Sequence, residues 1–303
     1  MRVFITGIGG FVGSRLARYL LAQGDQVSGT YIGEPPRMSG VAHVDLHEVD
    51  LLDRETLQRA IAAAEPDAIV NLAGLSSIGN SWKEARMPDY FWVNLVGTEN
   101  LLAAAAGRKV VIASSADVYG EVPAEKQPIS EDRPVSPRSP YALTKAASER
   151  LAFAYGRAVV ARSFNMIGPG QSPEFVLPSF AIQLAAISRG QGESTLKVGN
   201  LTARRDFVHV DDGAEAYRLL AEKGETGEVY NIASGEASSI DEILRILMTI
   251  SGVSARIEID KEKFRKVDLP LLTGDASRLR ALGWQPKRTL DDAVKDLWRD
   301  FGF

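Results

Sequence analysis

A glycine-rich turn close to the start of the chain constrains the fold more than any other feature. Residues 3–6 form a short β-rich run, and Gly7, Gly10 and Gly13 follow it in a G-x-x-G-x-x-G pattern, before an amphipathic, helix-prone stretch. Glycines at this spacing let a strand turn tightly into a helix and let a pyrophosphate approach the backbone. The helix N-terminus then favours the phosphates. The turn therefore predicts a Rossmann-type dinucleotide site rather than a loop without a ligand. The residues expected to contact the dinucleotide here are Gly7, Gly10, Phe11, Val12 and Gly13.

Strand-like and helix-like stretches alternate through the first half of the chain. The expected strands lie at 3–6, 26–31, 42–46, 67–72, 109–114 and 158–163. The expected helices lie at 12–23, 53–64, 89–106 and 141–156. Strands joined through helices form right-handed parallel crossovers, and the helices then cover both faces of the sheet. The chain is therefore expected to be an α/β protein, with a doubly wound parallel Rossmann sheet and a smaller C-terminal α/β substrate-binding lobe.

The alternation of strands and helices becomes less regular after Asn165, which indicates a boundary between two domains. Its 303 residues are enough for about two domains. The pattern predicts a dinucleotide-binding Rossmann domain at 1–165, with a return segment at about 205–233. The substrate-binding lobe is then expected at 166–204 and 234–303, so that the two lobes interleave along the sequence.

The end of the second expected strand bears on the identity of the dinucleotide. An acidic residue there usually binds the ribose hydroxyls of NAD, but the sequence reads Gly29-Thr30-Tyr31. Without that carboxylate a 2′-phosphate is not repelled, and Arg37 or Arg15 could bind it. NADP(H) is therefore favoured and NAD(H) stays possible, with Thr30 and Arg37 among the expected cofactor contacts.

Two further segments are expected to line the cofactor site from the carboxyl ends of the third and fourth strands. Asp50 and Leu51 follow the third strand, where they would contact the amino group of the adenine or, alternatively, form a helix-capping loop. Leu72, Ala73 and Gly74 lie where a dinucleotide would cross the sheet.

A tyrosine and a lysine four residues apart carry the predicted chemistry. Tyr141 and Lys145 fall on one face of an expected helix. A nearby cation favours the phenolate and so lowers the pKa of a tyrosine, which makes it a usable acid–base group. Ser115, at the end of the preceding strand, can hydrogen-bond the same substrate oxygen that Tyr141 would protonate. Alternatively, Tyr141 and Lys145 are only a pair of neighbouring residues on the surface of a helix.

The composition excludes several other chemistries. The chain has no cysteine and three histidines, so a thiol nucleophile and a thiolate metal site are excluded, and no metal is expected. With 35 basic and 39 acidic residues, the net charge of −4 gives no support for binding to nucleic acid or to an anionic membrane. The sequence shows neither a signal peptide nor an apolar run long enough to span a membrane, so a cytoplasmic protein is expected.

Three motifs carry a resemblance to a known family. They are Thr6-Gly-x-x-Gly-x-x-Gly13, Ser114-Ser-Ala-Asp-Val-Tyr-Gly120 and Ser139-Pro-Tyr-Ala-Leu-Thr-Lys145. Together they resemble the extended short-chain dehydrogenases/reductases that act on nucleotide sugars, the NDP-sugar epimerase/dehydratase family. The resemblance covers essentially the whole chain. It implies an NAD(P) cofactor, with Ser115, Tyr141 and Lys145 as the catalytic residues.

The loop from Asn165 to Gln171 narrows this resemblance. It reads Asn-Met-Ile-Gly-Pro-Gly-Gln and is similar to the loop of GDP-4-dehydro-6-deoxy-D-mannose reductases, except that they have His at the position of Met166. This departure leaves the exact sugar open. The 4,6-dehydratases carry an Asp-Glu pair where this chain has Ala116-Asp117. One of the two carboxylates that would act as acid and base in the elimination of water is therefore absent. Asp117 alone could instead cap the loop.

The resemblance therefore implies NAD(P)H-dependent reduction of the C4 keto group of GDP-4-dehydro-6-deoxy-D-mannose, which gives GDP-D-rhamnose or its C4 epimer. The alternatives are a GDP-mannose 4,6-dehydratase and an NDP-sugar 4-epimerase. An alternative of a different class is a non-catalytic dinucleotide-binding regulator, which would be expected to have a broken Ser/Tyr/Lys set.

The resemblance also implies which residues bind the GDP-sugar. Lys197 and Val198 would lie near the guanine, Arg205 and Arg265 would bind the diphosphate, and Asp268 would accept a hydrogen bond from the ribose. For a lone arginine, a surface salt bridge is the alternative. The complete implied set is Asp117, Asn165, Gln171, Val176, Lys197, Val198, Arg205, Arg265 and Asp268.

Two of the expected helices, at 89–106 and 141–156, are apolar over more than one stripe. An additional apolar face indicates burial against a partner. Relatives in the family pair these helices, so a homodimer held by a four-helix bundle is expected.

Overall fold

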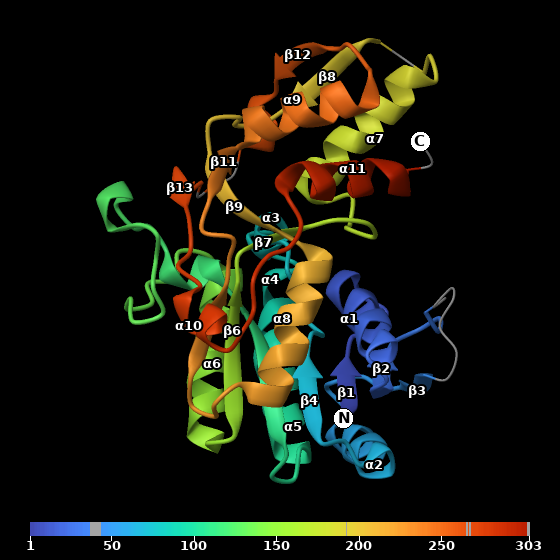
Figure 1. Cartoon of the computed structure of the whole chain (residues 1–303), viewed down its shortest axis with the longest axis vertical. Coiled ribbons are helices and arrows are strands. Elements are labelled where there is room, and N and C mark those ends of the chain that lie inside the picture. The colour runs from blue at the N-terminus through green and yellow to red at the C-terminus, as the bar shows by residue number, and fades with distance from the viewer. Residues whose placement is uncertain (37–43, 192, 265, 267, 302–303) are drawn as a thin grey trace.

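A seven-stranded parallel sheet forms the centre of the larger lobe in this computed structural model, which describes residues 1–36, 44–191, 193–264, 266 and 268–301 (Figure 1). Every neighbouring pair of strands is parallel, and the order is β10-β6-β5-β4-β1-β2-β3. The strands are β1 (Arg2–Thr6), β2 (Gln26–Tyr31), β3 (Val44–Glu48), β4 (Ala68–Asn71), β5 (Lys109–Ser115), β6 (Ala158–Ser163) and β10 (Val229–Ile232). The order reverses between β1 and β4, which is where ligands bind in doubly wound sheets. The predicted fold class is confirmed.

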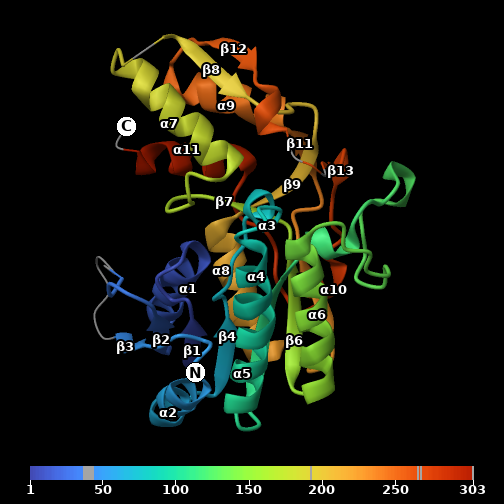
Figure 2. The same cartoon turned by 180° about the vertical axis from the view of Figure 1, so that it is seen from behind.

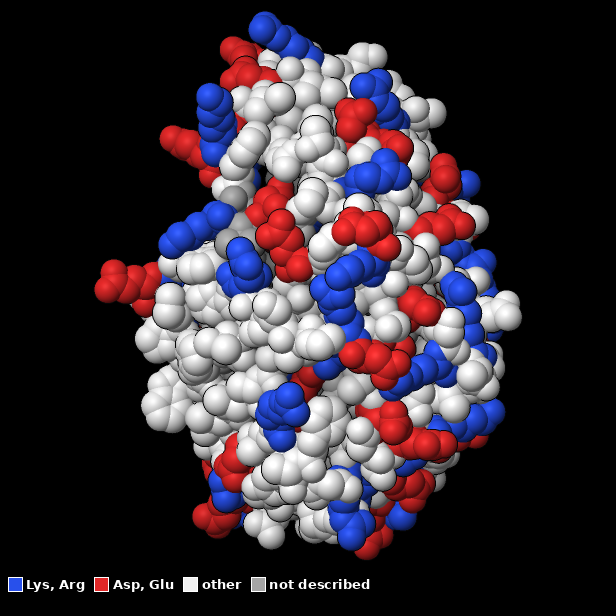
Figure 3. Space-filling model, turned by 90° about the vertical axis from the view of Figure 1, so that its left-hand side faces the viewer, with Lys and Arg blue, Asp and Glu red and all other residues white. Residues whose placement is uncertain are grey.

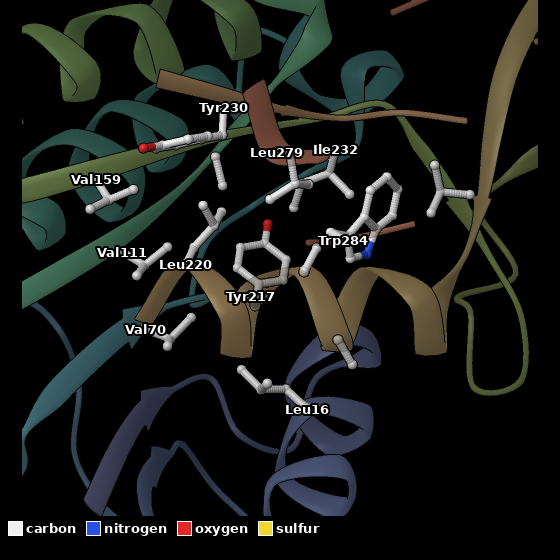
Figure 4. Close-up of a cluster of buried hydrophobic side chains, with 14 of the residues drawn as sticks. Leu16, Val70, Val111, Val159, Tyr217, Leu220, Tyr230, Ile232, Leu279 and Trp284 are labelled. Carbon is white, nitrogen blue, oxygen red and sulfur yellow. The ribbon is translucent and has the colours of Figure 1, made fainter. Parts of the chain in front are cut away.

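Helices cover both faces of this sheet because the side chains of each strand alternate between them. The helices of the larger lobe are α1 (Phe11–Ala22), α2 (Arg54–Ala64), α5 (Gly97–Ala104), α6 (Pro140–Tyr155) and α8 (Val210–Lys223). Leu16 of α1 and Tyr217 of α8 pack against Val70 and Val111 on one face (Figure 4). On the other face, Phe4 of β1 is buried with residues of α2, α5 and α6. Figure 2 shows α5 and α6 side by side on that second face.

A smaller lobe lies beyond the carboxyl ends of the sheet strands, at the top of Figure 1. Its four-stranded sheet consists of β7 (Asn165–Ile167), β9 (Arg204–His209), β11 (Ala237–Ser239) and β13 (Leu271–Leu272). A separate parallel pair is formed by β8 (Thr195–Val198) and β12 (Arg256–Ile259). The helices α7 (Val176–Ser188), α9 (Ile240–Ser251) and α11 (Leu290–Asp300) contribute to its own apolar core.

The structure differs from the sequence-based expectations in several places. The helix expected at 89–106 is divided into α4 (Met87–Tyr90), a π-helical segment η1 (Phe91–Val96) and α5. Short elements appear that the sequence pattern did not predict: α3 (Ile78–Ser81), α10 (Ser277–Ala281) and the 3-10 turns η2 (Ala116–Tyr119), η3 (Ala124–Lys126) and η4 (Lys261–Lys263).

Two kinds of feature are absent from the described residues. No helix among them combines the length and the apolar character needed to cross a membrane. No group of three or more His, Asp or Glu side chains among them is arranged to hold a metal ion.

The contact between β1 and β2 leaves no room for a side chain at Gly29. A Cβ atom there would lie 2.4 Å from the carbonyl oxygen of Ile5 and 2.9 Å from Cβ of Ile8. We therefore expect Gly29→Ala to lower the free energy of unfolding by about 1–3 kcal/mol, as overpacking of a core does. Urea unfolding followed by circular dichroism measures this.

Gly79 of α3 is the matched control, since a Cβ atom there would meet no atom within 4 Å. Gly79→Ala is expected to change the stability by less than about 0.5 kcal/mol. If the two variants unfolded at the same urea concentration, the close approach of β1 and β2 would not limit the fold.

Candidate active site

The glycine turn brings the start of α1 close to the ends of β1 and β4. Gly7 has a φ of 67°, and a Cβ atom on it would lie 2.9 Å from the backbone of Ala73. A Cβ atom on Gly13 would lie 2.3 Å from the carbonyl oxygen of Gly7. No side chain caps α1, and its first turn contains no acidic residue.

A pocket of about 500 Å³ opens beside this turn. Its lining residues are Gly7, Gly9, Gly10, Tyr31, Ile32, Glu34 and Pro36. Phe11 and Val12 form the partly buried first turn of α1 beside it. A cradle of backbone amides at an uncapped helix N-terminus suits phosphate oxygens, so the residues present fit a dinucleotide.

The residues expected near the 2′ position of the ribose have different environments. Thr30 is 2% exposed, and its Oγ1 accepts a hydrogen bond from the Gly7 N–H at 3.4 Å, so it supports the turn from below. Arg15 donates two hydrogen bonds of 2.6 Å to the carboxylate of Asp211, and this ion pair engages its guanidinium. Arg37, the other expected cation, lies outside the described residues.

The turn after β3 is anchored by hydrogen bonds. Asp50 is exposed, and its Oδ1 accepts from the Leu52 N–H at 2.9 Å, which is a turn-capping contact. The Leu51 side chain is buried in the core, and the Leu51 carbonyl accepts from Nδ2 of Asn100 at 2.9 Å. Asp50 therefore lies at the surface, while the side chain of Leu51 packs inside.

The segment 72–74 is fixed in place by an asparagine that the sequence analysis did not include among the site residues. Asn94 is 2% exposed within η1, accepts from the Leu75 N–H at 2.8 Å and donates to the Leu75 carbonyl at 3.0 Å. A Cβ atom on Gly74 would lie 2.9 Å from Oδ1 of Asn94 and 3.6 Å from Nζ of Lys145. Leu72, Ala73 and Gly74 thus connect the dinucleotide pocket to the predicted catalytic lysine. A polar residue in a mostly apolar helical stretch was the available indication of Asn94.

The structure brings Ser115, Tyr141 and Lys145 together where β5 ends and α6 begins. A hydrogen bond links Tyr141 to Ser115. Ser115 Oγ donates to Oδ2 of Asp117 at 3.1 Å and accepts from the Asp117 N–H at 3.2 Å. Lys145 Nζ donates to the carbonyl of Ala113 at 2.8 Å.

Burial controls the ionisation of this group. Burial raises the pKa of Tyr141 above its ordinary value, the charge of Asp117 raises it further, and the hydrogen bond with Ser115 opposes the shift. Burial also lowers the pKa of Lys145 to about 8, although the charge of Glu149 opposes this. The pKa of Tyr141 therefore moves in the direction opposite to that expected from the Tyr/Lys spacing, because loss of hydration penalises the phenolate.

A second pocket, of about 330 Å³, lies between the start of α6 and the smaller lobe. Its lining residues are Ile78, Asp117, Gly120, Arg138, Ser139, Arg205 and Leu269. Arg205 is 6% exposed and donates through Nη2 to Oδ1 of Asp268 at 2.7 Å. Asn200 donates to the other oxygen of Asp268, also at 2.7 Å. Three of the residues predicted to bind substrate, Asp117, Arg205 and Asp268, are therefore close together, while Ile78 and Arg138 were not predicted.

A buried carboxylate next to Arg205 holds this corner of the smaller lobe. Asp206 is fully buried, and burial raises its pKa although several hydrogen bonds oppose the shift. It accepts from the N–H and hydroxyl of Ser234, from the Gly235 N–H and from the Gly274 N–H, at 2.7–3.2 Å. These bonds tie two separate segments, 234–235 and the one at Gly274, to β9 and so hold Arg205 in place.

The loop at the junction of the lobes holds two more predicted residues. Asn165 donates through Nδ2 to the Asp206 carbonyl at 3.1 Å. Gln171 donates to the Met166 carbonyl at 2.9 Å, while its buried Oε1 has no partner among the described residues. The Met166 side chain packs against Gly213 of α8 and occupies the space that a side chain at 213 would need.

Three further residues expected to bind the GDP-sugar are not among those that line the Arg205 pocket. Val176 is the first residue of α7. Val198 is completely buried in the core of the smaller lobe. Lys197 is exposed, and its backbone is held by Gln183. Arg265 lies outside the described residues.

The chain matches known proteins over nearly its whole length. The family model described as GDP-mannose 4,6 dehydratase matches residues 4–297. A GDP-6-deoxy-D-mannose reductase of Pseudomonas aeruginosa is 34% identical over 99% of this chain and 97% of its own.

Two solved structures are similar over nearly their whole length. RMD from Pseudomonas aeruginosa, complexed with NADPH, has a TM-score of 0.85 and 33% identity, covering 99% of this chain and 98% of that one. UDP-glucose 4-epimerase of Thermus thermophilus, in complex with NAD, has a TM-score of 0.87 and 31% identity, covering 99% of both chains. The chain therefore belongs to the GDP-mannose 4,6-dehydratase family of extended short-chain dehydrogenases/reductases, as its motifs predicted.

Proposed function

We propose that this protein is an NAD(P)H-dependent reductase that converts the C4 keto group of GDP-4-dehydro-6-deoxy-D-mannose to the alcohol of GDP-D-rhamnose or its C4 epimer. The observation that carries the proposal is that Ser115, Tyr141 and Lys145 come together at the end of β5, beside the pocket that Arg205 lines. A phenol that stays protonated at neutral pH is a proton donor, which reduction of a ketone requires. The similarity to the Pseudomonas reductase supports the choice of sugar.

In the proposed mechanism the chain binds and orients the ketone and supplies a proton. Ser115 hydrogen-bonds the C4 oxygen, and Tyr141 donates its phenolic proton to that oxygen as the alcohol forms. A reduced nicotinamide, when bound, would supply the hydride for C4. Lys145 would hold the nicotinamide ribose, and its charge would stabilise the tyrosinate until Tyr141 is protonated again. Arg205 binds the diphosphate with its planar guanidinium.

We propose NADP(H) as the preferred cofactor, with NAD(H) as the alternative. The turn around Gly7, Gly10 and Gly13 would hold the pyrophosphate, and Leu72–Gly74 would lie beside the nicotinamide half. β2 ends without a ribose-binding acid, and Arg37 remains the candidate for a 2′-phosphate. The similar RMD structure contains NADPH, whereas the similar epimerase contains NAD. Both ligands are charged and would not cross a membrane unaided, so we place the reaction in the cytoplasm.

We also propose that the cofactor domain comprises 1–165 with a return at about 205–233, and that 166–204 and 234–303 form the substrate lobe. In support, β10 joins the seven-stranded sheet and α8 packs on it, although β9 pairs within the four-stranded sheet. The crossing between lobes therefore runs through β9, whose Arg205 lines the substrate pocket.

The function is tested by mixing the purified protein with NADPH and GDP-4-dehydro-6-deoxy-D-mannose. A reductase consumes NADPH in proportion to the ketosugar, as the absorbance of the reduced nicotinamide shows. Tyr141→Phe removes the proton donor, so its turnover should fall by about 10²–10⁴-fold while NADPH affinity is kept. Tyr19→Phe, on α1, is the matched control and should keep full turnover.

Other outcomes identify the alternatives. A dehydratase converts GDP-mannose without net loss of NADPH, and a 4-epimerase interconverts two sugars in the same way. A dehydratase is disfavoured because Ala116 stands where the 4,6-dehydratases carry the Asp of an Asp-Glu pair. If wild-type protein consumed neither NADPH nor NADH with the ketosugar, the reductase proposal would be wrong.

We further propose a homodimer in which α6 and the η1–α5 segment of two chains form a four-helix bundle. Trp92 is 57% exposed, Leu143 49% and Tyr155 39%, an unusual exposure for large apolar side chains. Figure 3, which views the side that carries α6, shows a broad area at mid-height with few charged residues. A second copy of the same face would cover these side chains.

Trp92→Glu is expected to convert the dimer to a monomer, because it would place a charge without a partner in the apolar contact. Light scattering coupled to size exclusion measures the mass. Ile182→Glu is the control, since Ile182 is also exposed (39%) but belongs to α7 of the smaller lobe. A monomeric wild-type protein would remove the dimer proposal.

A further inference from the structure

A buried carboxylate lies below the proposed catalytic pair and has no role in the mechanism above. Glu149 is 2% exposed and follows Lys145 by four residues on α6. A charged side chain is seldom buried this completely without a defined partner. The residues that contact the Glu149 carboxylate show which parts of the fold it holds together.

The Glu149 carboxylate bridges two neighbouring strands of the large sheet. Ser114 of β5 and Arg162 of β6 lie opposite each other in the parallel register. Oε1 of Glu149 accepts from the Ser114 hydroxyl at 2.5 Å and from Nε of Arg162 at 3.0 Å. Oε2 accepts from Nη2 of Arg162 at 2.8 Å. The fork of the guanidinium is therefore bound by both carboxylate oxygens.

Arg162 is itself held from its other side. Its guanidinium carbon lies 4.7 Å from the ring centroid of Tyr119, and Nη1 donates to the Glu131 carbonyl at 3.3 Å. The Tyr119 hydroxyl donates to Oδ1 of Asn231 on β10 at 2.7 Å. The ion pair is thus the centre of a polar network that runs from α6 across three strands.

Two polar contacts dock α6 on consecutive residues of β5. Lys145 donates to the Ala113 carbonyl, and Glu149 accepts from Ser114, the next residue. Ser115, which is hydrogen-bonded to Tyr141, comes directly after them. A shift of α6 along β5 would therefore change the geometry of Ser115, Tyr141 and Lys145 together.

Glu149 also supplies the charge that opposes the burial of Lys145. β5 presents the Ala113 carbonyl to the ammonium group, and the segment after β4 presents the backbone of Gly74, with the uncharged Asn94 behind it. The charge of Asp117, beside Ser115, acts on Tyr141. Arg162, the cation nearest Glu149, is paired with it.

We propose that Glu149 is a positioning residue for the reduction: clamped by Ser114 and Arg162, it fixes α6 on β5 and keeps Lys145 positively charged inside the protein. This inference rests on the proposed function, in which the charged Lys145 binds the nicotinamide ribose and stabilises the tyrosinate.

A charged lysine loses its proton as the pH rises through its pKa, so activity and NADPH affinity should decline on the alkaline side of about pH 8 in the wild type. Without the Glu149 charge the ammonium loses its electrostatic support and the decline begins at lower pH. A purely structural role would lower stability or turnover at every pH without moving this inflection.

The test is Glu149→Gln, which keeps the size of the side chain and its acceptor oxygen but removes the charge. The alkaline inflection of both NADPH binding and kcat should move down by about one pH unit, which corresponds to about tenfold in the ionisation of Lys145. KM for the ketosugar should change much less than kcat. Glu149→Asp, which keeps the charge, should restore the wild-type inflection even if kcat stays low.

Three further variants keep the result interpretable. Ser114→Ala removes one contact but leaves the ion pair, so kcat should fall without a shift of the inflection. If Glu149→Gln fails to fold because Arg162 is left buried and unpaired, the double variant Glu149→Gln/Arg162→Gln removes both charges and should fold. Its inflection should still lie below that of the wild type, because the Glu149 charge is absent there too. Glu55→Gln, an exposed carboxylate on α2, is the control.

The two possible failures are separable because NADPH binding, followed by nucleotide fluorescence, needs no ketosugar. Wild-type protein that binds NADPH but leaves the ketosugar unchanged would contradict the proposed function only. A Glu149→Gln protein with the wild-type inflection in NADPH binding would contradict the role of Glu149, whatever the substrate is.

Discussion

The close approach of Gly13 to the carbonyl of Gly7 is the constraint on which the rest of the site depends. A single Cβ atom at either glycine would collide with backbone, so α1 can begin directly after β1 in this way only if both positions are glycine. The same turn contacts Ala73 after β4, at the point where the strand order reverses. One local backbone contact thus aligns the phosphate cradle with the segment that leads to Lys145.

Burial determines the protonation of the two titratable side chains at the proposed catalytic end of the sheet. The pKa of Tyr141 is raised, so the phenol keeps its proton. The pKa of Lys145 is lowered to about 8, so the lysine begins to lose its charge just above neutral pH. A proton donor is what ketone reduction needs, and an oxidation would need the phenolate instead. Burial therefore keeps the phenol protonated, and the charge of Lys145 would stabilise the phenolate that forms when the proton is transferred.

Much of this architecture could be predicted from the sequence because its causes are local. The alternation of strands and helices predicted the parallel sheet, and the glycine spacing and the Tyr141/Lys145 interval predicted which loops meet at its carboxyl edge. The π-helical turn at Asn94 could not be predicted, since its hydrogen bonds go to Leu75 in a distant segment. Asp206, which joins β9 to loops near 234 and 274, was missed for the same reason. The direction of the Tyr141 pKa was also beyond reach, because burial is a property of the assembled fold.

The packing of Met166 against Gly213 bears on how the loop with the Gly-Pro-Gly sequence tolerates change. Gln171 is held by the backbone carbonyl of Met166, whereas the methionine side chain faces Gly213 in the first turn of α8. The loop can therefore keep its shape while the residue at 166 varies, as long as α8 has a matching hollow. The side chains at positions 166 and 213 share one space, so a larger residue at 213 requires a smaller one at 166.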